Sequence, residues 1–328
     1  MRNVFKNKKI LITGGLGFIG SNLAHCLVKM GARPMLLDSL IPDYGGNLFN
    51  IKGITRQVRV NIADMRDQNS INNLVQNQDY IFNLAGQVSH QDSMEDPHAD
   101  LEINCRAQLS FLKACRKYNP KVKIVFAGTR QVYGKPSYLP VDEKHLLQPT
   151  DVNGINKMAG EWYHILYNNV HGIKTVSLRL TNTYGPRQLM KHGRQGFIPF
   201  FAKQVLLGET INIFGDGQQK RDFNYVDDVV SAILLAAASN KANGEIFNLG
   251  GKRAYSLKEF TEILIKVAGQ GSYKFIPWPK EKKRIDIGDY YSDWKKIKKM
   301  LGWKPKVSLE QGLKQTLDYY RQHHKHYF

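Results

Sequence analysis

The sequence predicts an α/β fold in which a doubly wound parallel sheet carries a smaller, interleaved C-terminal lobe. Short apolar runs alternate with segments of helical periodicity through the first half of the chain. A glycine-rich turn follows the first apolar run. The apolar runs are continuous and do not alternate with polar residues, as is typical of strands that helices cover on both faces.

The first half of the chain contains six runs with the length of a strand. The expected strands are 10–12, 35–37, 58–60, 80–84, 123–126 and 175–178. Longer amphipathic segments lie between them. The expected helices are 18–30, 101–118 and one from about Lys157 to Val170.

The second half is less regular. Glycine and proline become frequent after 184–186, and we expect short helices near 197–207 and 257–267. The strongly apolar segment 226–238 reads as a helix that packs back on the first domain. We therefore expect a first domain of residues 1–184, with 222–250 packed on it, and a second lobe of residues 185–221 and 251–328.

Composition and charge limit the classes of protein to which the chain can belong. The chain has 328 residues, of which 42% are hydrophobic and 23% are charged, which is typical of a globular protein. The basic start has no apolar core of signal-peptide length and no run reaches the length of a membrane span, so we expect a cytoplasmic protein that does not bind membranes. Three cysteines without metal-ligand spacing predict reduced thiols and no metal site. The net charge of +19 comes without a nucleic-acid-binding motif, so we expect no nucleic-acid partner.

Three glycines open the helix after the first strand. Gly14, Gly17 and Gly20 give the spacing GxxGxxG. Glycine permits a tight turn and close approach of the backbone to a pyrophosphate, and the helix N-terminus then offers free N–H groups to the anion. The pattern predicts a dinucleotide on a Rossmann-type sheet, bound by these glycines with Phe18 and Ile19.

An acidic residue ends the second strand. Asp38 can accept hydrogen bonds from an adenosine ribose and would repel a 2′-phosphate. No Arg or Lys follows in 39–41. The cofactor is therefore expected to be NAD rather than NADP, with Asp64 and Met65 beside the adenine.

Five segments in sequence order resemble the extended short-chain dehydrogenase/reductase family, which comprises nucleotide-sugar epimerases, dehydratases and decarboxylases. They are residues 13–20, 83–87, 129–134, 179–186 and 214–228. The resemblance covers essentially the whole chain. It implies that Leu84, Ala85 and Gly86 line the cofactor, and that a UDP-sugar or similar nucleotide-sugar is the substrate.

The same resemblance implies a set of substrate contacts. Gln87 and Asn182 would contact the substrate, and Arg221 and Arg284 would bind its diphosphate. Guanidinium groups suit this role because they stay charged and offer two donors at once to phosphate oxygens.

The catalytic segment departs from the family. Thr129 matches the catalytic Ser/Thr. Lys157 matches a lysine that binds the cofactor and normally follows a tyrosine by four residues. Asn153 stands where that tyrosine is expected. A carboxamide cannot take up and return a proton near neutral pH. The one Tyr-x-x-x-Lys, at 291–295, lies in the second lobe and is interpreted as a coincidence.

Three interpretations follow from Asn153. Another residue acts as the base, the candidates being His90, Lys157, Tyr133, Tyr184 and His192. Alternatively, Asn153 positions a substrate that reacts differently. In the third, the protein binds cofactor and nucleotide-sugar without turnover.

The residues after Thr129 bear on the reaction. Dehydratases usually have Asp-Glu there, whereas this chain has Arg130 and Gln131. Elimination of water is therefore disfavoured, and Arg130 leaves decarboxylation of a uronic acid open. The resemblance favours an NAD-dependent UDP-hexose 4-epimerase, an isomerase of carbohydrate metabolism. It also implies a homodimer, formed through helices 101–118 and 157–170.

Overall fold

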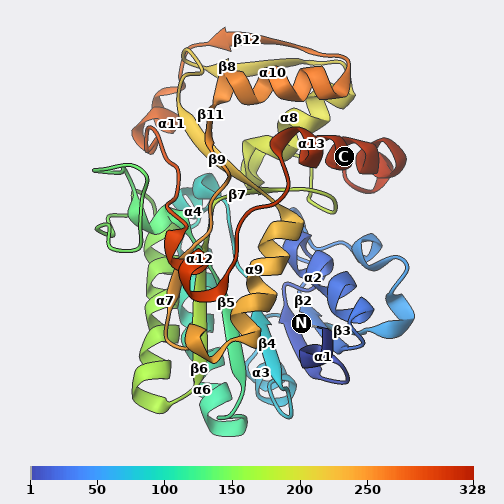
Figure 1. The fold of residues 1–328 in the computed structure, drawn as a ribbon, viewed down its shortest axis with the longest axis vertical. Helices are drawn as coiled ribbons and strands as arrows, with labels where there is room; N and C mark the ends of the chain where they lie inside the picture. Colours follow the sequence, from blue (N-terminus) through green and yellow to red (C-terminus); the bar gives the residue numbers. More distant parts are fainter. Residues whose placement is uncertain (1) are drawn as a thin grey trace.

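The computed structural model describes residues 2–328, and its largest element is a seven-stranded sheet (Figure 1). In order across the sheet the strands are β10 (Ile246–Asn248), β6 (Lys174–Leu180), β5 (Lys123–Thr129), β4 (Tyr80–Asn83), β1 (Lys9–Thr13), β2 (Arg33–Asp38) and β3 (Arg59–Ile62). All neighbouring pairs are parallel. The strand order reverses between β1 and β4, which is where doubly wound sheets bind ligands. The predicted fold class is confirmed.

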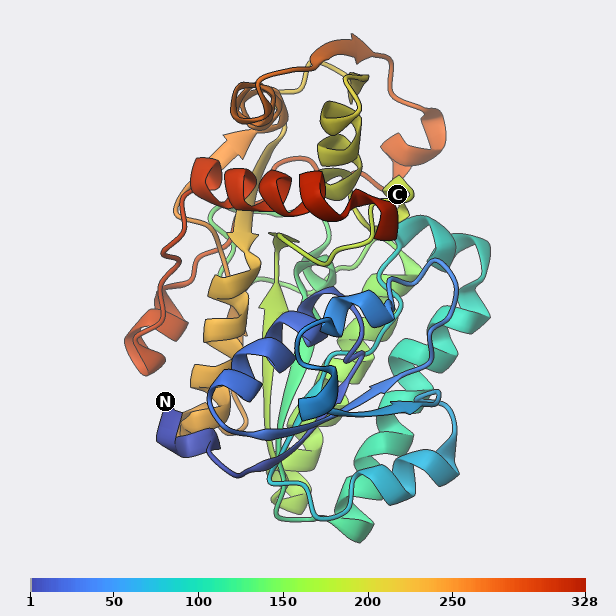
Figure 2. The same ribbon diagram turned by 90° about the vertical axis from the view of Figure 1, so that its right-hand side faces the viewer.

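Helices cover both faces of this sheet (Figures 1 and 2). On one face α2 (Phe18–Lys29) packs against α9 (Val226–Ala238). On the other face lie α3 (Gln68–Leu74), α6 (Ala107–Tyr118) and α7 (Val152–His171). Successive residues of β1 point to opposite faces, so that Ile10 and Ile12 join one hydrophobic core and Leu11 joins the other.

Helix α7 begins earlier than the sequence pattern predicted. It starts at Val152 because the Asp151 side chain caps it, accepting a hydrogen bond from the backbone N–H of Gly154 at 2.7 Å. The expected start near Lys157 was therefore wrong. The earlier start places Asn153 and Lys157 on one helix, four residues apart and so on the same side.

The expected helix 101–118 is interrupted. α5 (Pro97–Leu101) leads into a π-helical turn, η3 (Glu102–Arg106), before α6 begins. Such turns are frequent at functional sites. Here the turn carries Asn104, whose side chain donates to the carbonyl oxygen of Gln87 and to Asp100, both at 3.0 Å.

The second lobe lies above the large sheet in Figure 1. Its strands are β7 (Asn182–Tyr184), β9 (Lys220–Tyr225) and β11 (Ala254–Ser256) in one sheet, and β8 (Thr210–Phe214) and β12 (Ser272–Ile276) in a parallel pair. Its helices are α8 (Phe197–Leu206), α10 (Leu257–Ala268), α11 (Lys280–Arg284) and α13 (Leu309–His323). Helix α12 (Lys295–Leu301) instead packs on β10, at the edge of the large sheet. Helix α9 and strand β10 return the chain to the large sheet, so the two parts are interleaved.

The remaining elements are short. They are α1 (Arg2–Phe5), α4 (His90–Glu95) and the 3-10 turns η1 (Leu48–Ile51), η2 (Thr55–Gln57), η4 (Arg130–Tyr133), η5 (Gly193–Gln195), η6 (Asn240–Ala242) and η7 (His324–His326). Over residues 2–328, no helix has both the length and the apolarity that crossing a membrane requires.

Candidate active site

A first cavity of about 310 Å³ opens beyond the carboxyl ends of β1, β2 and β4. All the residues predicted to bind the cofactor line it: Gly14, Gly17, Phe18, Ile19, Gly20, Asp38, Asp64, Met65, Leu84, Ala85, Gly86 and Lys157. The volume falls in the range of ligand pockets. The residues predicted from the sequence to bind the cofactor are therefore among those that line the cavity.

The glycine turn has the geometry that a pyrophosphate requires. Gly14 has a φ of +66°, and a Cβ there would lie 3.1 Å from the backbone of Ala85. A Cβ at Gly20 would overlap the carbonyl oxygen of Gly14. Among the described residues no side chain caps α2, so its first N–H groups are available to an anion.

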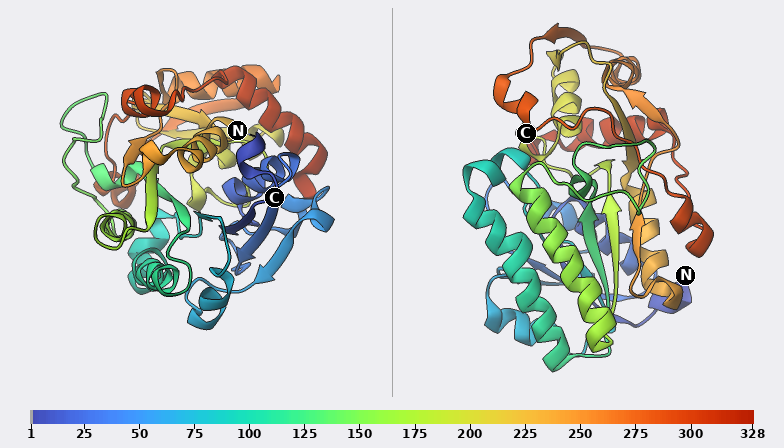
Figure 3. Two further views of the ribbon diagram at one scale, coloured as in Figure 1. Left: turned by 60° about the horizontal axis from the view of Figure 1, so that its bottom comes forward. Right: turned by 90° about the vertical axis from the view of Figure 1, so that its left-hand side faces the viewer.

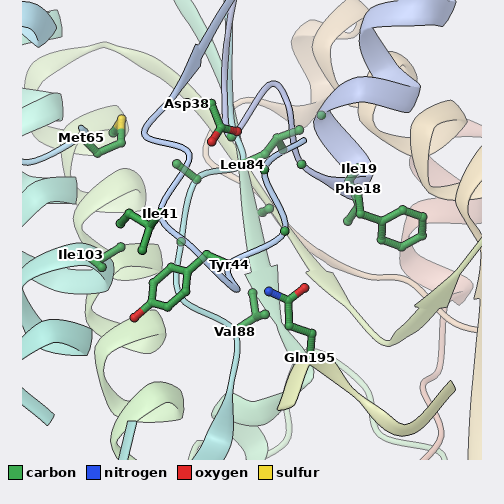
Figure 4. A pocket seen from close by; sticks show the side chains of 18 of the residues that line it. Phe18, Ile19, Asp38, Ile41, Tyr44, Met65, Leu84, Val88, Ile103 and Gln195 are labelled. Atoms are coloured by element: carbon green, nitrogen blue, oxygen red, sulfur yellow. The ribbon is translucent and has the colours of Figure 1, made fainter. Parts of the chain in front are cut away.

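Asp38 lies at one end of this cavity. Its carboxylate accepts hydrogen bonds from the backbone N–H groups of Leu16 and Leu40, each at 3.0 Å. Burial raises the pKa of Asp38, and these N–H groups oppose that rise. Figure 4 shows the carboxylate between Met65 on one side and the Phe18–Ile19 turn on the other. A ribose bound there would find the Asp38 carboxylate oxygens already held in position by these backbone N–H groups.

Lys157 closes the inner end of the first cavity. Its ammonium nitrogen lies against Gly86, where a side chain would displace it. Burial lowers the pKa of Lys157 to about 8, and the Asp100 carboxylate opposes this shift. The lysine is thus held where the cofactor cavity ends, on the face of α7 that also carries Asn153.

Asn153 is buried and directed inward. Its Nδ2 donates to the carbonyl oxygen of Gln87 at 2.9 Å, to Oε1 of the same residue at 3.0 Å, and to Oδ2 of Asp100 at 2.8 Å. Asp100 also accepts from Asn104 and Asn156. The asparagine therefore belongs to a buried polar cluster centred on one carboxylate.

This cluster corrects the prediction for Gln87. The residue is 3% exposed, and its side chain donates to the carbonyl oxygen of Ser89 and accepts from Asn153. It lies behind Asn153 and is therefore a support of the site rather than a substrate contact.

A second cavity of about 690 Å³ lies between the large sheet and the second lobe. It shares a wall with the first: Val88, Thr129, Gln131, Leu180, Thr181, Thr183, Gln188 and Gln195 line both. The Thr129 hydroxyl oxygen accepts a hydrogen bond from the backbone N–H of Gln131 at 3.2 Å. Thr129 is thus at the junction of the two cavities, as a residue that contacts both ligands must be.

Two predicted substrate residues line the second cavity. They are Asn182, whose side chain donates to the carbonyl oxygen of Asp222 at 3.0 Å, and Arg221. Arg221 is 8% exposed, and its guanidinium donates to the carbonyl oxygens of Lys220 and Gly288. Burial lowers the pKa of Arg221 to about 10.

Arg284, which was predicted to bind the substrate's diphosphate, does not line the second cavity in this structure. Arg284 is exposed at the end of α11, while Lys282, Ile285 and Asp286 line the second cavity. Side chains two residues apart on a helix point to roughly opposite sides. Because Lys282 faces the cavity, Arg284 faces away from it.

His90 enters the second cavity from the start of α4. Its Nδ1 contacts Oδ2 of Asp151, and its Nε2 contacts the side-chain amide nitrogen of Gln131. The His90 side chain is 37% exposed, whereas the Asp151 side chain is only 2% exposed. Burial raises the pKa of Asp151, but hydrogen bonding and charge from His90 outweigh it and leave the pKa below its ordinary value.

Arg130 lines the same cavity beside this pair. Its guanidinium lies 5.1 Å from the centre of the Tyr290 ring. Its Nη1 is buried and has no hydrogen-bond partner within residues 2–328. Burial lowers the pKa of Arg130, and nearby acids including Asp222 and Asp151 oppose that shift. A buried donor in the wall of this cavity is available to an acceptor atom there.

The other predicted bases lie elsewhere. Tyr133 is fully buried, donates to Asn248 at 2.7 Å and accepts from Arg179 at 2.6 Å, and burial raises its pKa to about 12. Tyr184 is buried with its hydroxyl 3.4 Å from the carbonyl oxygen of Leu309. His192 lies near Asp43, 3.9 Å away. Both tyrosines are structural, so neither can serve as the base.

Sequence reasoning missed Asp151, Asp100 and Asn104. Asp151 was recognisable in principle, because an acid three residues before Gly154 at the start of an apolar periodic segment is a helix-capping signal. Asp100 and Asn104 carry no such signal, since their roles depend on contacts with residues 53 and 17 positions away.

Comparisons with known proteins agree with this geometry. The family described as GDP-mannose 4,6 dehydratase matches residues 11–316. A putative UDP-glucose 4-epimerase of Methanocaldococcus jannaschii is 36% identical, with 96% of this chain and 99% of the relative covered. A UDP-N-acetyl-α-D-glucosaminuronate decarboxylase of Bacillus cytotoxicus is 34% identical over 96% of this chain and 98% of the relative.

A solved structure has the same fold with ligands bound. The UDP-glucuronic acid 4-epimerase of Bacillus cereus, in complex with UDP-glucuronic acid and NAD, superposes with a TM-score of 0.84 at 29% identity, covering 96% of this chain and 99% of the other. The match spans both lobes and both cavities. The chain belongs to the extended short-chain dehydrogenase/reductase family, among its NAD-dependent nucleotide-sugar epimerases and dehydratases.

Proposed function

We propose that the protein is an NAD-dependent nucleotide-sugar epimerase that acts at C4 of a UDP-hexose or a related sugar, with an atypical acid–base site. One observation carries the proposal: the cavity lined by the glycine turn and the cavity lined by Arg221 meet at Thr129. A dinucleotide and a nucleotide-sugar bound in the two cavities would bring their reacting ends together there.

In this proposal each group of residues around the two cavities has its own role in binding or orienting the ligands. The glycine turn and Asp38 hold the dinucleotide, and Lys157 holds its inner end. Arg221 binds the sugar-linked diphosphate, and the Thr129 hydroxyl orients the sugar hydroxyl. NAD supplies a reversible acceptor for the hydrogen and the two electrons that leave C4. Asn153 takes the place of the family's tyrosine and does not move a proton.

The relatives support epimerisation as the first reaction to test. The Methanocaldococcus jannaschii relative is described as a putative 4-epimerase, and the Bacillus cereus structure is a 4-epimerase with NAD bound. Dehydratases usually have Asp-Glu after the catalytic Thr, and this chain does not. Epimerisation at C4 does not need that pair, because oxidation and reduction at one carbon suffice.

The test is turnover on a panel of UDP-glucose, UDP-galactose, UDP-N-acetylglucosamine and UDP-glucuronate with added NAD, followed by NMR. We expect one member to convert to its C4 epimer at substoichiometric enzyme. Binding of NAD and UDP-sugar without any conversion would instead indicate a binding protein and overturn the proposal.

Arg130 favours a second candidate function. Its buried, unpartnered Nη1 in the substrate cavity suits a sugar carboxylate, as in a UDP-uronate decarboxylase. Loss of carbon dioxide from UDP-glucuronate in the same panel, seen as a pentose product, would identify this reaction.

We further propose a homodimer formed through α6 and α7. These helices run side by side on the outer face of the sheet (Figure 3, right). Along α7, Ile155, Trp162 and Leu166 are each 50% exposed, and Val170 is 63% exposed. Because their spacings of four and seven residues place them on one side of the helix, they form an apolar stripe suited to a second copy.

A further inference from the structure

We propose that His90, oriented by Asp151, is the catalytic acid–base that replaces the family's tyrosine. The inference rests on the proposed function, because it assigns the proton transfer that C4 oxidation requires. In that oxidation the C4 hydroxyl proton moves to Nε2 of His90, and NAD, when bound, would accept the hydride that leaves C4, so that a 4-ketone results. Both transfers reverse when the ketone is reduced on its other face.

Three elements of the fold bring His90, Asp151 and Gln131 together. His90 is the first residue of α4, Asp151 caps α7, and Gln131 lies in η4, two residues after Thr129. His90 and Asp151 are 61 positions apart in the chain, and His90 and Gln131 are 41 apart. Three independent segments therefore direct these polar side chains to one spot in the wall of the substrate cavity.

The partners of His90 fix which ring nitrogen holds the proton. An ionised carboxylate only accepts, so Nδ1 must donate to Asp151. Nε2 of the neutral ring then carries the free electron pair, and the Gln131 amide donates to it. A sugar hydroxyl in place of that amide would also donate to Nε2, which is the first step of its deprotonation.

Asp151 is well suited to hold this orientation. Its Oδ1 accepts from the backbone N–H of Gly154 at 2.7 Å, which leaves Oδ2 for the imidazole. The nearly complete burial of its side chain allows little movement. In His–Asp pairs of hydrolases a carboxylate likewise holds the imidazole in one tautomer and stabilises its protonated form.

The position of the pair distinguishes it from the other candidates. His90 and Asp151 line the substrate cavity, as does Thr129, whereas Lys157 and Asn153 line the cofactor cavity. The hydroxyl of Tyr133 is engaged by Arg179 and Asn248. His90 therefore combines a titratable group, partial exposure and a position in the wall of the cavity that Thr129 also lines.

The charges around the pair are mixed. Besides Asp151, the charged side chains that line the same cavity are Arg130, Arg194, Arg221, Lys282 and Asp286. Only the neutral imidazole has a free electron pair on Nε2, so a doubly protonated His90 could not accept the proton of the sugar hydroxyl.

The experiment compares His90→Asn with the wild type on whichever panel sugar is converted. Asparagine can still donate to Asp151 but has no group that takes up a proton. We expect kcat to fall about 10²- to 10⁴-fold, the pH dependence of kcat to change, and the dissociation constants for NAD and UDP to change less than threefold. His98→Asn, at an exposed position of α5, is the matched control and should retain full activity.

A second variant tests the orienting role. Asp151→Asn preserves the helix cap, because asparagine caps as well as aspartate, but no longer forces the proton onto Nδ1. We expect a lower kcat with little change in KM and an unchanged unfolding midpoint. A full rate in either His90→Asn or Asp151→Asn, with the pH profile unaltered, would overturn the proposal while leaving the epimerase function intact.

A readout without turnover separates the two proposals. Nitrogen-15 NMR of the histidine rings should show His90 protonated at Nδ1, with the Nε2 resonance shifting when a UDP-sugar is added to the NAD complex. His90→Asn assigns the resonance. If the wild type converts no panel sugar, this shift still supports the placement of His90 at the sugar, and its absence overturns that placement.

Discussion

Nδ2 of Asn153 lies 2.8 Å from Oδ2 of Asp100, in the interior beside the cofactor cavity. Asp100 is 1% exposed and also accepts from Asn104 and Asn156. Three asparagine amides thus surround one buried carboxylate, and Asn153 contributes a donor that tyrosine would not place there. This explains how the chain uses Asn153 structurally.

Asn153→Asp should destabilise the protein in a pH-dependent way. A second carboxylate beside Asp100 would have its pKa raised in the folded state, so the penalty is full at high pH and shrinks as pH falls. We expect a loss of about 2–4 kcal/mol at pH 8. Urea unfolding at pH 8 and pH 5 measures it, and Asn169→Asp, exposed on the same helix, should have little effect at either pH. Equal losses at both pH values would contradict the argument.

We expect the ligand-free protein to become more stable as the pH rises, because of the lowered pKa of Lys157. Its folded pKa of about 8 lies below the ordinary 10.5, so the unfolded chain binds more protons between these values. The free energy of unfolding should therefore rise between pH 8 and 10.5, by up to about 3 kcal/mol from this group. Lys157→Met should lack this rise. Lys123, with a pKa that burial also lowers to about 8, is present in both proteins and cancels.

Arg130 and Arg221 should differ in what they recognise. Arg130→Met should weaken binding of UDP-glucuronate at least tenfold and leave UDP binding unchanged, because it removes a partner of the sugar's carboxylate only. Arg221→Met should weaken UDP itself. Calorimetry with UDP, UDP-glucose and UDP-glucuronate measures both. If Arg130→Met weakens UDP-glucose as much as UDP-glucuronate, the carboxylate role is wrong.

Asp38→Asn should relax the preference for NAD. The carboxylate accepts from Leu16 and Leu40 and would repel a 2′-phosphate. We expect NAD to bind about tenfold more weakly in the variant, with NADP affected less. Asp67→Asn is the control, since Asp67 is exposed, caps α3 as asparagine also can, and does not line the cofactor cavity. An unchanged ratio of NAD to NADP affinity would show that Asp38 does not meet the ribose.

Trp162→Glu should disrupt the proposed dimer. The side chain lies in the apolar stripe of α7, and a charge in an interface core is strongly unfavourable. Sedimentation should show a dimer for the wild type at micromolar concentration and a monomer for the variant. Leu207→Glu, equally exposed at the end of α8, should remain dimeric. A monomeric wild type would end the proposal.

The sequence by itself determined the fold class and the cofactor cavity. Continuous apolar runs specify buried parallel strands wherever they occur, and the glycine spacing specifies its own turn. These are local signals, read within about twenty residues. For this reason the glycines of the turn and Asp38 line one cavity, together with Leu84, Ala85, Gly86 and Lys157, which the family resemblance supplied.

The tertiary structure decided the catalytic site. It turned Gln87 inward and Arg284 outward, and it joined His90 to Asp151 across 61 positions. Such outcomes depend on which strand ends meet and which way each helix is rotated, and packing sets both. Residue type placed Asn153 where the family's tyrosine is expected, whereas only the arrangement of α4, η4 and α7 brings His90, Gln131 and Asp151 together in the wall of the second cavity.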